Sequence, residues 1–129
     1  MDKIFLDYGP LALAFVGDSV LETLIRKQLV LTGTHDTGTL TEISHTLSCA
    51  NSQSERYENI KDYLNEVEQE VFLNARNHKS KAHPKSASAV DYKRSTGFEA
   101  IFGYLYLKQD TDRLNELFNL AYKDILFQE

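Results

Sequence analysis

The chain has 129 residues, 42% hydrophobic and 26% charged, with a formal net charge of −5. This size and composition predict that residues 1–129 form a single globular domain with a buried core. The only cysteine, Cys49, excludes an internal disulfide, and no Cys/His spacing is typical of structural zinc. The longest apolar run, LALAFV, is too short to cross a bilayer, and residues 1–10 lack a signal-peptide pattern. We therefore expect a cytoplasmic protein with no membrane partner.

The N-terminal third of the chain has strong helical patterns. Residues 9–32 are apolar on nearly every face when wound as a helix, which predicts a buried central helix that ends near Gly33. Thr39 and Glu42 fit a capping box that opens a second helix. The residues of that helix expected to face the core are Leu40, Ile43 and Leu47.

The rest of the chain is also predicted to be helical. Tyr57 to Val67 shows helical spacing, and Asn65 with Glu68 indicates a new cap, so we expect two tightly joined helices there. Residues 76–89 lack apolar periodicity and should form an exposed, mobile loop. An apolar helix resumes at about residue 90 or 96 and runs to 108, and an amphipathic helix follows over residues 111–127. No segment has a strand pattern, so the predicted fold class is all-α.

Two acidic residues occupy helix faces that are otherwise apolar. Asp18 lies at nearly the same helical angle as Ile25 and should point into the core, and Glu99 has aromatic and small neighbours. A buried carboxylate normally takes up a proton or finds a cation. A Mg²⁺ ion held between the two would satisfy both, because Mg²⁺ takes oxygen ligands and keeps waters for a phosphate. In the structural alternative, Thr96 and Glu99 form a capping box and Asp18 pairs with a cation or a hydroxyl.

Two separated motifs resemble Mini-ribonuclease III, the compact branch of the ribonuclease III family. They are LALAFVGDSVLE at residues 11–22, and RNHKS, PK and YKRSTGFEAIFGYLYL between residues 76 and 107. The similarity spans about residues 10–125 and preserves the order of the motifs. It implies an all-helical, homodimeric endoribonuclease that cleaves double-stranded RNA with Mg²⁺, or with Mn²⁺ in its place, and leaves 5′-phosphate products. By analogy with the branch, the expected substrate is precursor ribosomal RNA, and a ribosomal protein bound to that RNA is a further candidate partner.

The resemblance also implies which residues form the site. Asp18 of the G-D motif and Glu99 of the F-E-A motif match the metal-binding catalytic pair. Larger relatives carry a glutamate four residues before that aspartate and an aspartate three before that glutamate, whereas this chain has Ala14 and Thr96, as the Mini branch does. Glu22, one turn after Asp18, and Thr96 are weaker candidates to support the pair. The ordinary alternative for Glu22 is a surface ion pair on its own helix.

Positive charge is concentrated where RNA contacts are expected. Residues 73–94 carry +5 and the other 107 residues carry −10, which favours phosphate binding by this stretch over a merely solvated loop. His78 and His83 are interpreted as loop residues, because a metal-bound water needs no histidine base. The predicted RNA-binding residues are Arg76, Asn77, Lys79, Ser80, Lys81, Lys85 and Arg94.

Two features of the sequence and two other functions remain as alternatives. Tyr104 and Tyr106 could stack on bases, but aromatic residues at helical spacing are usually core. Residues 41–51 contain no Lys or Arg, in contrast to Mini-type relatives, so RNA affinity or substrate preference can differ. A non-cleaving RNA-binding module of the same fold that assists RNA or ribosome maturation is the main alternative function. An acidic helical interaction domain without an RNA role fits the charge pattern least.

Overall fold

The computed structural model describes residues 7–33, 36–79 and 85–126, and every regular element in these ranges is helical. The expected all-α class is therefore confirmed. Within the same ranges, no helix combines the length and apolar character needed to cross a membrane. In chain order the elements are α1 (Pro10–Leu31), α2 (Thr37–Ser48), α3 (Ala50–Ile60), a 3-10 turn η2 (Lys61–Tyr63), α4 (Glu66–Arg76), α5 (Ala89–Leu107) and α6 (Thr111–Ala121).

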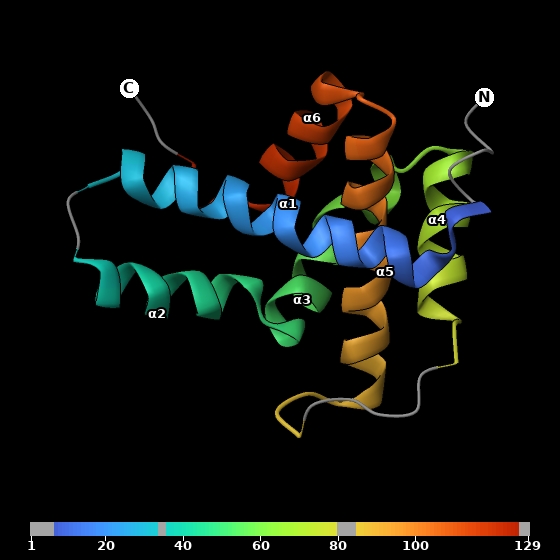
Figure 1. The fold of residues 1–129 in the computed structure, drawn as a ribbon, viewed down its shortest axis with the longest axis horizontal. Helices are drawn as coiled ribbons and strands as arrows, with labels where there is room; N and C mark the ends of the chain where they lie inside the picture. Colours follow the sequence, from blue (N-terminus) through green and yellow to red (C-terminus); the bar gives the residue numbers. More distant parts are fainter. Residues whose placement is uncertain (1–6, 34–35, 80–84, 127–129) are drawn as a thin grey trace.

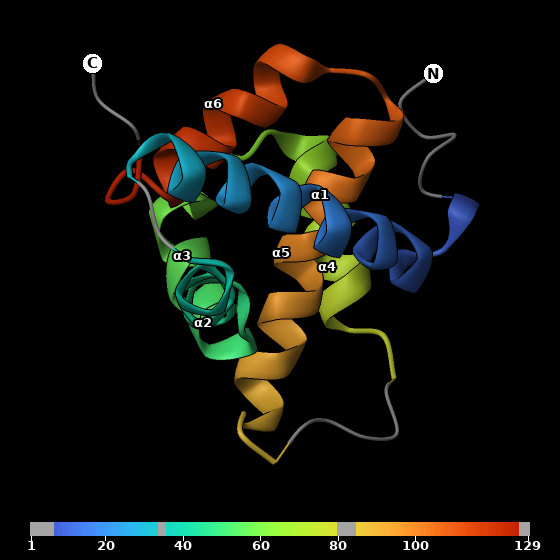
Figure 2. The same ribbon diagram turned by 60° about the vertical axis from the view of Figure 1, so that its left-hand side comes forward.

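The central helix is α5, not α1. It packs against α1, α3, α4 and α6, and Figures 1 and 2 show α1 crossing it, with α4 on one side and α2 and α3 on the other. The helix predicted at residues 9–32 is confirmed as α1, but its predicted central and buried position is wrong, because α1 has an exposed outer face on which Phe15 is 81% and Val30 62% exposed. Periodicity shows that a face is apolar but does not show whether another helix of the same chain covers it.

The backbones of α1 and α5 touch at two glycines. A Cβ atom at Gly17 would lie 1.7 Å from the carbonyl oxygen of Glu99, and one at Gly103 would lie 1.8 Å from the carbonyl oxygen of Leu13. Any side chain at these positions would force the helices apart. Because Asp18 directly follows Gly17, this close approach also brings Asp18 next to Glu99.

The helix starts follow identifiable side-chain caps. Asp36 accepts a hydrogen bond from the Thr39 backbone N–H at 2.8 Å, so α2 begins at Thr37 and the predicted capping box at Thr39 and Glu42 is wrong. The capping box of Asn65 and Glu68 before α4 is confirmed, with both of its hydrogen bonds at 2.9 Å.

The later boundaries also differ in part from the prediction. Ser88 caps α5, which begins at Ala89 and thus near the earlier of the two expected starts. The final helix ends at Ala121 instead of reaching residue 127. The chain leaves the helix at Tyr122, whose buried ring lets its hydroxyl donate to the Leu47 carbonyl at 3.2 Å. The ring itself stacks on Phe118 of α6, and the hydroxyl ties the end of α6 to α2.

The core is aromatic and contains one buried ion pair. Tyr104 is buried and Tyr106 is 58% exposed, so the core interpretation holds for Tyr104 but not for Tyr106. Glu68 is 1% exposed and accepts two hydrogen bonds from Arg113, from Nη2 at 2.7 Å and from Nε at 2.9 Å. Arg113 also donates to the Tyr63 carbonyl at 2.6 Å. This paired charge, which the sequence did not predict, fixes the start of α6 to the start of α4.

Candidate active site

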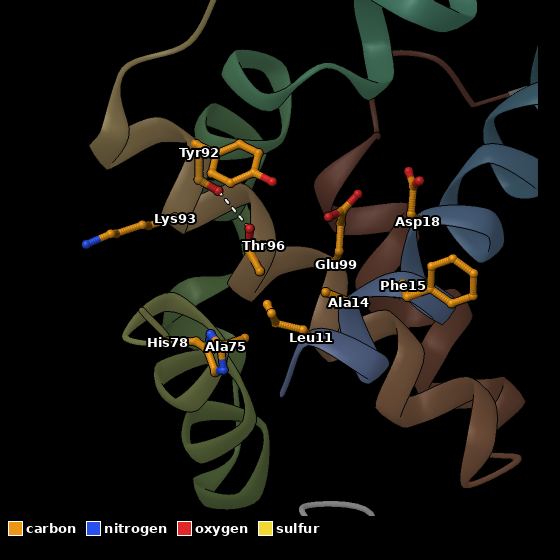
Figure 3. A pocket seen from close by; sticks show the side chains of 10 residues that line it. All are labelled: Leu11, Ala14, Phe15, Asp18, Ala75, His78, Tyr92, Lys93, Thr96 and Glu99. Carbon is orange, nitrogen blue, oxygen red and sulfur yellow. Dashed lines mark hydrogen bonds between the residues drawn. The ribbon is translucent and has the colours of Figure 1, made fainter. Parts of the chain in front are cut away.

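Asp18 and Glu99 converge on one pocket. Figure 3 shows their carboxylates side by side and pointing the same way, Asp18 from α1 and Glu99 from α5. Both line a pocket of about 210 Å³. The prediction that Asp18 points into the core is wrong, since this residue is exposed. Ile25 has a similar helical angle but is buried, because it lies in the C-terminal half of α1, next to α2. The turn of α1 that carries Asp18 borders the open pocket instead.

The surroundings of Glu99 strongly perturb its carboxyl group. Burial raises the pKa of Glu99 to about 9, and the negative charge and hydrogen bonding of Asp18 add to the rise. A hydrogen bond from Gln53 Nε2 to Glu99 Oε2, at 3.5 Å, acts in the opposite direction. Within the described residues, no Lys or Arg forms an ion pair with either acid. Without such a partner Glu99 keeps its proton near neutral pH, and an external cation would favour the form in which both acids are ionised.

The donor set fits Mg²⁺ better than zinc. Among the described residues, no group of three or more His, Cys, Asp or Glu side chains could hold a metal ion. Zinc sites normally have three or four such ligands, whereas Mg²⁺ is commonly held by one or two carboxylates and keeps several waters. Two carboxylates that share a solvent-open pocket match the second pattern.

The remaining polar wall of the pocket comes from the ends of α4 and α5. His78, Tyr92, Lys93 and Thr96 line it with the two acids. Thr96 donates its hydroxyl to the Tyr92 carbonyl at 3.0 Å, one turn earlier in α5. Since α5 begins well before this residue, a capping box of Thr96 and Glu99 is excluded. Of these wall residues, sequence reasoning named only Thr96 as a site residue.

Glu22 lies one turn beyond Asp18 but is directed away from the pocket. Its Oε1 accepts hydrogen bonds from the Ser44 hydroxyl and from Arg26 Nε, the latter at 2.9 Å. Although burial alone would raise it, these hydrogen bonds hold the pKa of Glu22 below its usual value. Glu22 thus joins α1 to α2, and it does not line the pocket.

The predicted RNA-binding residues are only partly grouped. Asn77, Lys79 and Lys85 are exposed and flank the segment that joins α4 to α5. Arg76 is half-buried and donates from Nε to Asn77 Oδ1 at 3.1 Å. The predictions that fall on Ser80, Lys81 and His83 lie outside the described residues.

Arg94 lies in a different environment from the other cations. It forms an ion pair with Glu58 of α3 and lies 5.3 Å from the centre of the Tyr57 ring. Its side chain is 25% exposed. Both partners belong to α3, so Arg94 links α5 to α3. Lys93, its neighbour in sequence, is the cation that reaches the pocket wall.

Comparison with known proteins supplies the family. Residues 11–110 match the ribonuclease III domain. The Mini-ribonuclease 3 of Clostridium tetani is 39% identical over 88% of this chain and 76% of its own length. The Mini-ribonuclease 3 of Symbiobacterium thermophilum is 37% identical over 90% of this chain and 89% of its own length.

This chain belongs to the ribonuclease III family. Within that family, its similarity to several proteins named Mini-ribonuclease 3 places it in the Mini branch, which confirms the resemblance seen in the sequence. A crystal structure of a protein from Fusobacterium nucleatum superimposes with a TM-score of 0.82 at 32% identity, covering 93% of this chain and 96% of that one. The segment of this chain that matches the ribonuclease III domain thus includes both sequence motifs.

Proposed function

We propose that this member of the ribonuclease III family is a Mg²⁺-dependent endoribonuclease that cleaves double-stranded RNA. The observation that carries the proposal is the convergence of Asp18 and Glu99 on one open pocket, from helices that are far apart in sequence. Family membership supports the reaction class, since ribonuclease III enzymes are endoribonucleases. The raised pKa of Glu99 is consistent with the proposal, since burial is its main cause and the negative charge of the neighbouring Asp18 adds to it.

Asp18 and Glu99 would hold the metal ion. When bound, Mg²⁺ lowers the pKa of a coordinated water and neutralises charge on the phosphate that is cleaved. Asp18 is exposed and presents its carboxylate directly to the pocket. Glu99 is more buried and must lose a proton to become a ligand, so metal binding at neutral pH is coupled to proton release. Mn²⁺ should substitute because it accepts the same oxygen ligands.

The chain's cations would hold the RNA backbone. Lys79 is exposed and directly follows His78 of the pocket wall, and Lys85 is exposed shortly before the start of α5. Cations at these positions can neutralise phosphates on both sides of the cleaved bond, a contact that is independent of sequence. Such contacts suit recognition of an A-form duplex by its shape. We propose precursor ribosomal RNA as the natural substrate and a ribosomal protein bound to it as a partner, on the strength of the family resemblance alone.

A homodimer is part of the proposal. Phe15 is 81% and Leu11 46% exposed, and both line the pocket that holds Asp18 and Glu99. Apolar side chains grouped on an outer helix face are typical of a surface that another chain covers. A second copy would bury them and would double the length of duplex in contact with protein, since a symmetric pair presents two pockets.

The proposal is tested with labelled duplex RNA and single-stranded RNA, each incubated with Mg²⁺ or with EDTA. We expect cleavage of the duplex with Mg²⁺ only, and products with 5′-phosphates. Asp18→Asn should abolish cleavage while duplex binding persists, whereas Asp62→Asn, at an exposed aspartate in η2, should cleave normally. If the protein binds the duplex but cleaves it with neither Mg²⁺ nor Mn²⁺, the result would instead favour the non-cleaving RNA-binding module.

A further inference from the structure

One buried polar side chain of α3 contacts the proposed metal site. Gln53 is 2% exposed, although an uncharged amide in a helical core costs free energy unless it is hydrogen-bonded. Its Nε2 donates to Glu99 Oε2 at 3.5 Å. The contact joins two helices whose residues are 46 positions apart in sequence. It falls on the more buried acid of the pair, on the side of Glu99 that faces α3.

A neutral donor at this position has a specific physical consequence. The carboxylates of Asp18 and Glu99 lie side by side and repel each other when both are ionised. A lysine or arginine in place of Gln53 would neutralise the pair and compete with a metal ion for it. An apolar residue would leave the Glu99 carboxylate without an anchor to α3. An amide orients the carboxylate without supplying a positive charge.

We propose that Gln53 is a positioning residue that holds the Glu99 carboxylate beside Asp18 and thereby sets the affinity of the site for a divalent metal. The inference rests on the proposed function. Side chains that hydrogen-bond to metal ligands commonly change metal affinity by about 10–100-fold when they are removed. Because the observed hydrogen bond is long, we expect the lower end of that range.

The adjacent residue provides a matched control. Ser54 is 1% exposed and its hydroxyl donates to Asp91 Oδ1 at 2.8 Å, so it also joins α3 to α5 through a buried polar contact. Asp91 lies in the first turn of α5 and does not line the pocket. Ser54→Ala therefore removes an equivalent contact between the same two helices without touching either acid.

The test measures Mn²⁺ binding by electron paramagnetic resonance, together with the Mg²⁺ dependence of duplex cleavage and the thermal unfolding of metal-free protein. Gln53→Met keeps the length of the side chain and removes the donor. Gln53→Asn keeps the amide but shortens its reach, and it decides the question if the Met variant does not fold. We expect both variants to weaken Mn²⁺ binding by about tenfold and to need more Mg²⁺ for half-maximal cleavage, with a nearly normal rate at saturating Mg²⁺. Ser54→Ala should lower the unfolding temperature and leave Mn²⁺ affinity unchanged.

Two results would overturn the inference. One is wild-type Mn²⁺ affinity in a folded Gln53 variant, and the other is an equal loss of affinity in Ser54→Ala, which would mean that any loosening of α3 on α5 has the same effect. Failure of the wild-type protein to bind Mn²⁺ or to cleave duplex RNA would instead refute the proposed function itself. The two failures are therefore distinguishable in one set of measurements.

Discussion

The contact between α1 and α5 makes Gly17→Ala a sharp test of how the site is assembled. The added Cβ would lie 1.7 Å from the Glu99 carbonyl oxygen, whereas ordinary van der Waals contacts begin at 3.4 Å. The atom that it meets belongs to the backbone of α5, so no side-chain rotation can relieve the clash. The helices must separate, and the carboxylates of Asp18 and Glu99 must separate with them.

The expected cost is at the upper end of the range for overpacked cores. Inserting a methyl group into a packed core costs about 1–3 kcal/mol, which for a domain of this size lowers the melting temperature by roughly 5–12 °C. Mn²⁺ affinity should fall with stability, because the ligands no longer meet. Gly38→Ala adds the same group to an exposed turn of α2 and should change neither quantity appreciably. Thermal unfolding at fixed protein concentration and Mn²⁺ titration decide the matter. A Gly17→Ala protein with normal stability and normal Mn²⁺ binding would refute the packing reasoning.

Three further outcomes follow from the charges. The pKa of Glu99 rises from 4.5 when unfolded to about 9 when folded, so the folded state binds more protons in this interval and stability falls as pH rises through it. In urea unfolding at pH 8, the free energy of unfolding of metal-free Glu99→Gln should therefore exceed that of wild type by on the order of 1–3 kcal/mol. At pH 4 the two proteins should differ little. A Glu99→Gln protein that is less stable than wild type at pH 8 would contradict this reasoning. Arg113→Met leaves buried Glu68 without its charged partner and should lower the free energy of unfolding by about 3 kcal/mol. Adding Glu68→Gln to the same chain should restore most of that stability. Replacing Lys79 and Lys85 by Ala should lower the slope of log binding constant against log salt concentration by about two, one for each lost phosphate contact. An unchanged slope would exclude both lysines as phosphate contacts.

The sequence was sufficient for the helical class and for some of the helix boundaries. Periodicity placed both ends of α1 within one residue, but it did not show the break between α2 and α3 and it extended the last helix beyond Ala121. The cap formed by Asn65 and Glu68 was predicted correctly because both of its hydrogen bonds are local. Asp18 and Glu99 stood out as acids on apolar helix faces, but the resemblance of the two motifs to Mini-ribonuclease III was needed to name them as a pair. Local chemistry of this kind leaves a signal within a few positions of sequence.

Exposure, and contacts between residues that are far apart in sequence, could not be predicted. The exposure of Asp18 depends on which helices cover each half of α1, and a helical wheel does not contain that information. The partnership of Arg113 with Glu68, and that of Gln53 with Glu99, join residues more than 40 positions apart. Each of these side chains looks like an ordinary polar residue of a helix surface. Only the docking of α3, α4 and α6 shows that Gln53 and Glu68 are buried.

Anomalous diffraction from a crystal grown with Mn²⁺ tests most directly whether Asp18 and Glu99 bind a metal together. We predict a peak within about 2.5 Å of a carboxylate oxygen of each residue, and its loss in Asp18→Asn crystals grown under the same conditions. An active protein whose strongest peak lies away from both carboxylates would contradict the site described above.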